Sequence, residues 1–230
     1  RNPLNLSPMK FWKMNGAGNS FVIFDDRKGT LNLKPEEVKA LADPATGVGA
    51  DQVIAMEQTL RGDVFMRIWN KDGSSAEACG NATRCVAWLA MKDAGRDDLV
   101  VETVAGRLAS RRAGDMTISV DMGSPLLKWA EIPLAERMAT RGIDLKIGPI
   151  DAPYLQMPGC VSMGNPHCIF FVDDLEAVDF RAVGSLVEWH PLFPEGVNVG
   201  FAQITAPDAM RLRTWERGVG YTKACGTNIC

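Results

Sequence analysis

The sequence is poor in histidine and tyrosine and has no excess of positive charge. Its 230 residues include 2 histidines and 2 tyrosines, and its formal net charge is −3 at pH 7. Without a basic field, neither a nucleic-acid backbone nor an anionic membrane surface is an expected partner. The composition therefore favours a small-molecule substrate.

Segments that direct proteins to membranes are also missing. No charged stretch followed by an apolar core opens the chain, so we expect a cytoplasmic rather than a secreted protein. The longest uncharged run, residues 152–172, is long enough to span a bilayer, but it contains Pro153, Pro158 and Pro166. We interpret this run as loop and strand.

The six cysteines do not indicate a disulfide framework, and their spacing does not match a zinc site. A chain of this length without a signal peptide is expected to keep its thiols reduced. The separations of Cys79 from Cys85 and of Cys225 from Cys230 are longer than those of a zinc knuckle. We therefore predict no metal site, and we interpret Cys85, Cys160, Cys168 and Cys230 as small buried hydrophobic residues.

Two halves of the chain share short strings at one constant offset, which is 146 residues between Gly18 and Gly164 (164 − 18). A period this long indicates a duplicated domain, and two copies can face each other about a pseudo-twofold axis. We expect an N-terminal repeat over residues 9–124 and a C-terminal repeat over residues 125–230. The aligned strings are 18–24 with 164–170, 67–70 with 213–216, 78–80 with 224–226, and Gln52 with Asn198.

The two ends of the chain carry expectations of their own. Met9 has the character of a natural start, which makes residues 1–8 an upstream extension or a remnant. The first copy continues to about Gly123, whereas the second stops shortly after Cys225. The repeat therefore predicts that roughly 40 further residues would complete the second copy.

Local patterns predict the main elements of each half. Apolar, β-rich runs predict strands at 21–24, 64–69, 116–120 and 169–172. Pro35, followed by acidic residues, predicts a surface helix over 35–42. The segment after Cys79 is apolar on nearly every side and stops before Gly95, which predicts a buried helix with its N-terminus at Cys79.

Cys79 and Cys225 each stand in an Ala-Cys-Gly string at the predicted start of a helix. Unpaired backbone N–H groups and the helix dipole favour a thiolate at such a position. The N–H groups of Gly80-Asn81 and Gly226-Thr227 can also cradle a carboxylate. Thiolate and bound anion would then be neighbours.

Two such units about a pseudo-twofold axis place two thiols on opposite sides of one bound carboxylate. One thiolate can remove an α-proton from one face while the other thiol delivers a proton to the opposite face, which inverts the stereocentre. The helix N-termini stabilise the charge that develops on the carboxylate. Neither pyridoxal phosphate nor a metal ion is required, and we expect no cofactor.

Uncharged amides recur at repeat-related positions, namely Asn19 with Asn165 and Gln52 with Asn198. Asn70 breaks this symmetry because Glu216, followed by Arg217, stands at its repeat position. Arg217 can bind a second carboxylate in a bidentate manner, and Glu216 can bind an ammonium group. The asymmetry suits a substrate with two amino-acid ends. His167 either supports the site or bonds a neighbouring loop.

Over residues 9–226, the sequence resembles the diaminopimelate epimerase family. The strings that carry the resemblance are 13–19, 49–52, 67–70 with 72–74, 78–81, 164–167, 197–198, 216–218 and 224–227. The family implies an α+β fold of two pseudo-twofold-related domains, each a β-barrel-like mixed sheet around a central helix. It also implies a cytoplasmic enzyme, often a homodimer, that interconverts LL- and meso-2,6-diaminoheptanedioate in lysine and peptidoglycan-precursor synthesis.

The resemblance also assigns residues. It implies catalytic thiols at Cys79 and Cys225 and substrate contacts at Asn19, Gln52, Asn70, Gly80, Asn81, Asn165, Asn198, Glu216, Arg217, Gly226 and Thr227. The chain departs from the family pattern at Asn15 and Ser20, where His and Asp are usual, and at Asn228-Ile229, where Gly-Ala is usual.

Two other functions remain open from the sequence. One is a cofactor-independent racemase of the same fold that acts on proline-type substrates. The other is a non-catalytic thiol protein in which Cys79 and Cys225 form a redox-switched disulfide.

Overall fold

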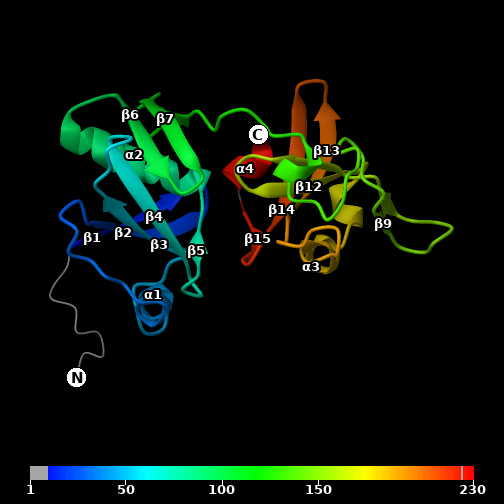
Figure 1. The fold of residues 1–230 in the computed structure, drawn as a ribbon, viewed down its shortest axis with the longest axis horizontal. Helices are drawn as coiled ribbons and strands as arrows, with labels where there is room; N and C mark the ends of the chain where they lie inside the picture. Colours follow the sequence, from blue (N-terminus) through cyan, green and yellow to red (C-terminus); the bar gives the residue numbers. More distant parts are fainter. Residues whose placement is uncertain (1–9, 224) are drawn as a thin grey trace. The chain divides into compact units, whose positions relative to one another are not determined.

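The computed structural model describes residues 10–223 and 225–230, and it contains two compact units divided between Met122 and Gly123 (Figure 1). We call residues up to 122 unit 1 and residues 123–230 unit 2. The predicted start at Met9 and the predicted extension over residues 1–8 lie outside the described residues. None of the described helices is long and apolar enough to cross a membrane.

Unit 1 is a mixed eight-stranded sheet with two α-helices. The strand order is β1-β2-β3-β4-β6-β7-β8, with β5 paired to β4. The pairs β2–β3 and β4–β6 are parallel, and the other pairs are antiparallel. The elements are β1 (Phe11–Gly16), β2 (Asn19–Asp25), α1 (Pro35–Ala42), β3 (Gln52–Glu57), β4 (Val64–Asn70), β5 (Ser75–Ala76), α2 (Gly80–Ala94), β6 (Asp98–Thr103), β7 (Gly106–Arg112) and β8 (Ile118–Val120).

Alternating side chains of β2 supply two apolar layers on the two faces of this sheet. Phe21 and Ile23 pack in the cluster that contains the buried residues of α2. Val22 and Phe24 pack instead in the cluster that contains the buried residues of α1. Successive strand residues point to opposite faces. The two helices therefore cover opposite faces of the sheet (Figure 1).

Both predicted helices of unit 1 are confirmed at their ends. Helix α1 has Pro35 in its first turn and ends at Ala42. Helix α2 has Cys79 as its N-cap, and Gly95 ends it with a left-handed φ of 63°. A residue with a side chain is strained at such a φ, which is why glycine stops the helix there.

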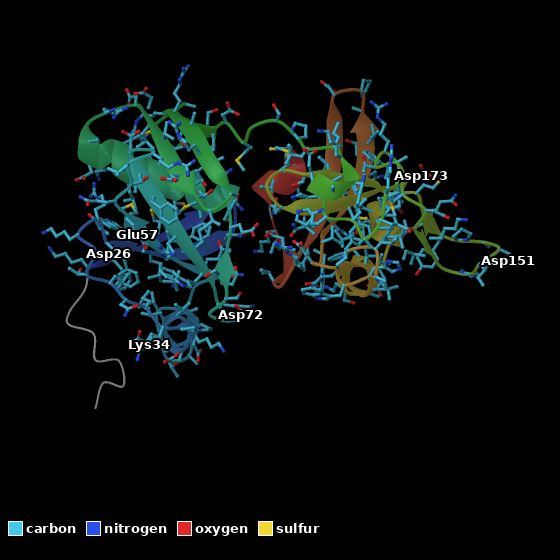
Figure 2. The ribbon with its side chains drawn as sticks, viewed as in Figure 1. Asp26, Lys34, Glu57, Asp72, Asp151 and Asp173 are labelled. Carbon is cyan, nitrogen blue, oxygen red and sulfur yellow. The ribbon has the colours of Figure 1, made fainter. Side chains whose placement is uncertain are left out.

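Asp26 fixes the loop that leads from β2 to α1. Its carboxylate is buried and accepts hydrogen bonds from the backbone N–H groups of Thr30 and Leu31 at 2.7 and 2.8 Å. Figure 2 labels Asp26 together with Glu57, which lies at the end of the neighbouring strand β3. The buried carboxylate satisfies backbone donors that the loop would otherwise leave unpaired.

Unit 2 contains a five-stranded sheet of order β11-β12-β13-β14-β15 and a separate β9–β10 pair. Helix α3 packs against β13, β14 and β15. The only parallel pair among the described strands of this sheet is β12–β13. The elements are the 3-10 turns η1 (Trp129–Glu131) and η2 (Leu175–Ala177), with β9 (Lys146–Ile147), β10 (Leu155–Gln156), β11 (Gly159–Ser162), β12 (Pro166–Phe171), α3 (Phe180–Glu188), β13 (Asn198–Ala206), β14 (Ala209–Glu216), β15 (Gly220–Thr222) and α4 (Gly226–Ile229).

The predicted repeat recurs in the register of the strand ladders. Strand β2 pairs with β3, and β12 with β13, in the same parallel manner and at the same offset. The antiparallel pairs that follow also correspond. The matching partners are Phe21↔Gln52 with His167↔Asn198, Val53↔Trp69 with Val199↔Trp215, and Ile68↔Ala76 with Thr214↔Thr222.

Strand boundaries differ from the predicted ones in two places. The run at 116–120 forms a strand only from Ile118, because Met116 is 69% exposed in the preceding turn. The run at 169–172 belongs to β12, which begins earlier, at Pro166, and ends at Phe171. The apolar pattern of the sequence predicted the approximate position of both strands. Their ends are set by hydrogen bonding to the neighbouring strands.

The sheet face next to the cysteine helix is covered more completely in unit 1, by α2, than in unit 2, by α4. In unit 1, Ile23, Met56, Val64 and Met66 are buried in the cluster that includes α2. At the corresponding positions of unit 2, Ile169, Ala202, Met210 and Leu212 line a groove of about 280 Å³ beside α4. This groove is apolar over most of its lining.

Candidate functional site

The first cysteine turn is formed where β5 leads into α2. Cys79 has the extended N-cap conformation, with φ −152° and ψ 110°, and its side chain is partly buried. Its carbonyl oxygen accepts hydrogen bonds from the backbone N–H and the hydroxyl of Thr83, both at 2.9 Å. The thiol therefore stands at the N-terminal end of a fifteen-residue helix.

Gly16 brings the β1–β2 turn close to the first turn of α2. A Cβ atom on Gly16 would lie 2.8 Å from the carbonyl oxygen of Asn81, so only glycine fits there. Gly16 pairs with Asn19 across the turn. Asn19 is thus held next to the helix start, while Asn81 is buried and accepts a hydrogen bond from Arg84 Nη2 at 2.5 Å.

Gln52 and Asn70 face each other across β3 and β4. Gln52 Nε2 donates to Asn70 Oδ1 at 3.0 Å, and Asn70 Nδ2 donates to Ser74 Oγ at 3.1 Å. Ser74 is fixed in turn by Asp72, whose carboxylate lies in the β4–β5 turn (Figure 2). Gln52 is only 9% exposed, and its Oε1 has no hydrogen-bond partner among the described residues. Buried oxygens of this kind normally have a partner.

The second cysteine turn repeats the backbone geometry of the first. Cys225 caps α4 with φ −129° and ψ 111°, again one residue before a helical glycine. It is more buried than Cys79, at 6% exposed. Its Sγ lies 3.3 Å from the hydroxyl of Thr227.

The pKa of Cys225 departs from the prediction. The helix N-terminus was expected to favour the thiolate, and the N–H groups of Thr227 and Asn228 do act in that direction, as does the Thr227 hydroxyl. Burial and the negative charge of Glu216 outweigh them and raise the pKa of Cys225 to about 12. The resting form of the Cys225 side chain is therefore the thiol.

Asn165 and His167 lie beneath the second cysteine turn. Asn165 Nδ2 donates to Thr227 Oγ1 at 3.3 Å, and Asn165 Oδ1 lies 2.9 Å from His167 Nε2. His167 Nδ1 lies 3.1 Å from Asn228 Oδ1, and Asn228 Nδ2 donates to Thr214 Oγ1 at 2.7 Å. His167 is fully buried, and burial lowers its pKa to about 4. His167 thus contacts Asn165, in the loop between β11 and β12, and Asn228, in α4.

Asn198, Glu216 and Arg217 are grouped at the start of β13 and the end of β14. Asn198 Oδ1 accepts a hydrogen bond from the backbone N–H of Arg217 at 2.9 Å, and Asn198 Nδ2 donates to the carbonyl of Pro166. The Arg217 guanidinium donates to the carbonyl of Glu195, and Glu216 accepts from the Thr222 hydroxyl at 2.5 Å. Both charged side chains are partly exposed.

The predicted residues therefore fall into two groups, one in each unit. In unit 1 the structure joins Gln52 to Asn70 directly and sets Asn19 near the start of α2. In unit 2 it joins Asn165, Thr227 and Cys225 in one chain of contacts, with His167 attached. Sequence reasoning missed Thr214 and noted Asn228 only as a departure. The sequence does carry a signal for these two residues. Thr214 and Asn228 are polar, whereas Ile68 and Ala82 stand at the corresponding positions of the first half.

None of the cysteines, all of which are described, forms a disulfide. Cys85, Cys160 and Cys168 are buried as predicted, and burial raises the pKa of Cys85 to about 11. The prediction is wrong for Cys230, which is exposed. The described residues contain no cluster of three or more His, Cys, Asp or Glu side chains suited to a metal ion.

Known proteins resemble the chain over nearly its whole length. The family model for diaminopimelate epimerase matches residues 11–128 and 159–230. A protein named diaminopimelate epimerase from Caulobacter vibrioides is 53% identical over 228 residues, which cover 96% of this chain and 79% of that protein. One of the same name from a Methylobacterium species is 50% identical over 232 residues, covering 98% and 79%.

Solved structures share the fold at low sequence identity. A hydroxyproline epimerase from Agrobacterium vitis aligns with a TM-score of 0.67 at 16% identity, covering 96% of this chain and 74% of that one. A PhzF-family phenazine biosynthesis protein from Bacillus anthracis aligns with a TM-score of 0.62 at 17% identity, covering 97% and 78%. The α+β architecture of two units with mixed sheets is therefore shared beyond close relatives.

Proposed function

The chain belongs to the diaminopimelate epimerase family, and on that premise we propose that it interconverts LL- and meso-2,6-diaminoheptanedioate without a cofactor. Cys79 and Cys225 are the two catalytic residues. Each comes from one of two repeats, which we assign to residues 9–124 and 125–230. The substrate is a small diamino dicarboxylate with an amino-acid group at each end.

The reaction is a 1,1-proton transfer at one α-carbon. The thiolate of one cysteine takes the α-proton, and the electron pair of the broken C–H bond remains on carbon and is delocalised into the carboxylate. The thiol of the other cysteine then donates its proton to the opposite face and becomes the thiolate. Atoms and charge balance, because the two cysteines have exchanged protonation states.

The observation that carries this proposal is the equivalence of the two cysteine turns. Both cysteines are N-caps in an extended conformation, each is followed by a helical glycine, and both lie at the same repeat position. The backbone N–H groups that follow them, from Gly80, Asn81, Gly226 and Thr227, can hold one carboxylate where charge develops.

Burial of the second cysteine turn has a functional consequence. The pKa of Cys225, about 12, keeps its side chain in the thiol form, which holds the proton to be donated. Removing the proton requires the site to add stabilisation of the thiolate. The ammonium group of a bound substrate is one source of positive charge beside it.

The unpaired oxygen of Gln52 supports a polar ligand in unit 1. Its Nε2 is held by Asn70, so its buried Oε1 is left to accept from a group outside the described residues. A substrate ammonium N–H has the required chemistry. Asn19 and Asn81 lie near the same helix start, while Asn165, Asn198, Glu216 and Arg217 supply polar groups in unit 2. His167 supports Asn165.

The proposed function is tested by supplying the purified protein with LL-diaminoheptanedioate and following the meso isomer by chiral chromatography. Formation of the meso isomer without added pyridoxal phosphate or metal, and with a chelator present, supports the proposal. L-proline serves as the competing substrate. Racemisation of proline with no turnover of the diamino dicarboxylate would instead identify a proline-type racemase.

A redox role for the same cysteines is tested separately. Mass spectrometry of the oxidised protein would reveal a Cys79–Cys225 disulfide, and activity that returns with a thiol reductant would show reversible inactivation. Calorimetry on the reduced protein decides the remaining case, because no binding of the substrate would favour a non-catalytic thiol protein.

The family also supports a cytoplasmic enzyme that assembles as a homodimer, and we propose both for this chain. Light scattering coupled to gel filtration distinguishes a dimer from a monomer of 25.0 kDa. Cell fractionation tests the location.

A further inference from the structure

The buried contacts of His167 contain a proton conflict. Both ring nitrogens face an amide oxygen, Asn165 Oδ1 at 2.9 Å and Asn228 Oδ1 at 3.1 Å. Amide oxygens only accept hydrogen bonds, so both contacts are satisfied only if both nitrogens carry protons. The ring would then be a buried imidazolium.

The surroundings of His167 exclude that charge at neutral pH. The side chain is 0% exposed, and burial lowers its pKa to about 4. The positive charge of Arg217 contributes to this lowering of the pKa, and the hydrogen bond with Asn228 opposes it without cancelling it. With a single ring proton, one of the two amides must turn its NH2 end toward the ring. The two ends of an amide have the same shape, so hydrogen-bond partners decide between them.

The role of Cys225 decides which amide turns. A thiolate can only accept hydrogen bonds, so the Thr227 hydroxyl must donate to Cys225 Sγ at 3.3 Å. Thr227 Oγ1 then has to accept from Asn165 Nδ2, as the structure has it at 3.3 Å. Asn165 therefore keeps its oxygen toward His167 Nε2, and Asn228 is the amide that turns.

We propose that these residues form a directional hydrogen-bond chain that ends on Cys225 and stabilises its thiolate. Each member donates to the next, in the order Thr214, Asn228, His167, Asn165, Thr227 and Cys225. His167 is neutral, with its proton on Nε2 and its Nδ1 accepting from Asn228. The chain rests on the proposed function of Cys225 as a base, and Thr214, Asn228 and His167 act in it as positioning residues.

Aligned donors of this kind polarise one another in a buried environment. Their effect opposes the burial and the Glu216 charge that raise the pKa of Cys225. The hydrogen-bond chain therefore stabilises the Cys225 thiolate in addition to the charge of the substrate ammonium group.

Gly200 leaves the space that the Asn228 side chain occupies in this hydrogen-bond chain. A Cβ atom on Gly200 would lie 2.8 Å from Asn228 Nδ2 and 2.9 Å from Asn228 Oδ1. In unit 1 the position of Gly200 is taken by Ile54, which pairs with Ile68 as Gly200 pairs with Thr214. Unit 1 thus has the buried apolar set Phe21, Ile54, Ile68 and Ala82 where unit 2 has His167, Gly200, Thr214 and Asn228.

The test is nitrogen NMR of the protein labelled with ¹⁵N-histidine. The protein has only 2 histidines, so the variant His190→Gln leaves His167 as the single labelled ring. The proposal expects the same arrangement to be present already while Cys225 is a thiol, with one protonated nitrogen, Nε2, at pH 7, and a changed ring signal in Asn228→Ala. A proton on Nδ1, or protons on both ring nitrogens, would contradict the proposed hydrogen-bond chain. This readout needs no catalysis, so an inactive protein with an Nε2 proton would contradict the proposed function alone.

Alkylation of Cys225 by iodoacetamide, followed by peptide mass spectrometry at fixed pH, tests the effect on the thiolate. Thr227→Val removes a hydrogen bond to a charged group and is expected to slow the reaction by about tenfold or more. Asn228→Ala is expected to slow it in the same direction. A merely structural role would loosen the turn and speed alkylation, which would overturn the proposal. Thr103→Val, a buried hydroxyl in unit 1, is the matched control and leaves the rate unchanged.

Discussion

The two units share a backbone plan around their cysteines but differ in what lies beneath them. Strand register and N-cap conformation recur at the same offset. Under α2 the sheet presents apolar side chains such as Phe21 and Ile68, whereas under α4 it presents His167 and Thr214. The two units therefore place their cysteines in the same way, but the buried side chains beneath the cysteine turn are apolar in unit 1 and polar in unit 2.

The same difference is seen in the residues that accompany each cysteine. Unit 1 has two neutral amides, Gln52 and Asn70, joined by a hydrogen bond. In unit 2 Glu216 replaces Asn70 at the repeat position and is followed by Arg217. In the proposed function, such a break would let one end of a two-ended substrate be bound differently from the other.

The largest expected effect comes from removing either thiol. Cys79→Ala and Cys225→Ala are each expected to lower kcat by roughly 10²–10⁴-fold or more, because each deletes one proton-transfer group. Steady-state epimerisation assays measure the loss, and Cys230→Ala, at an exposed thiol in neither cysteine turn, is the matched control with unchanged kcat. Near-full activity in either catalytic variant would show that the two units are not equivalent in function.

The polar core of unit 2 is expected to make stability depend on pH. The pKa of His167 is about 4 in the folded protein and about 6.5 when unfolded, so the unfolded chain takes up the proton first as the pH falls. The free energy of unfolding should therefore fall between pH 6.5 and pH 4, by up to about 3 kcal/mol.

Urea unfolding at several pH values measures this decline. A variant that copies unit 1, with His167→Phe, Gly200→Ile, Thr214→Ile and Asn228→Ala, should lose this part of the dependence. An equal decline in that variant would assign the effect to other groups, including His190, whose pKa is also lowered by burial.

The charged end of unit 2 is expected to contribute to substrate affinity. Arg217→Ala removes a guanidinium that can bind a carboxylate, which should weaken binding of diaminopimelate by about tenfold to a hundredfold. Isothermal titration calorimetry gives the dissociation constant. Arg211→Ala, on the preceding strand β14 and paired with Glu176, is the control. Unchanged affinity in Arg217→Ala would mean that the second carboxylate is bound elsewhere.

The smallest expected effect concerns the end of α2. Gly95→Ala places a side chain at φ 63° and should destabilise the protein by about 1 kcal/mol, with little change in turnover. Gly159→Ala is the control, since its Cβ would have only an ordinary contact, at 3.7 Å from the Arg141 carbonyl. A lower Tm in the first variant alone, measured by calorimetry, supports the capping role, whereas equal Tm values would contradict it.

Much of this organisation could be predicted from the sequence, because it depends on local chemistry and on a repeat. Helix α2 between Cys79 and Gly95 follows from apolar spacing, a helix start and a glycine stop. The offset of 146 residues, seen between Gly18 and Gly164, was sufficient to match strands that pair far apart along the chain (164 − 18). The predicted burial of Cys230 was wrong because burial depends on packing that the sequence around it does not encode.

Other features of the site required three-dimensional contacts. The orphaned Oε1 of Gln52 results from its pairing with Asn70 across two strands. The contacts of His167 with Asn165 and Asn228 join residues up to 61 positions apart. The high pKa of Cys225 arises because burial outweighs the helix N–H groups, a balance that spacing alone does not reveal.

The most direct test of the two-base account is the fate of the α-hydrogen in deuterated water. The protein converts LL-diaminoheptanedioate under initial-rate conditions, and mass spectrometry and NMR measure label in the meso product. Because one thiol removes the proton and the other supplies a different one, every newly formed product molecule should carry deuterium at the inverted carbon. Product that retains the original hydrogen in a substantial fraction would mean that a single base acts on both faces, and would contradict the account.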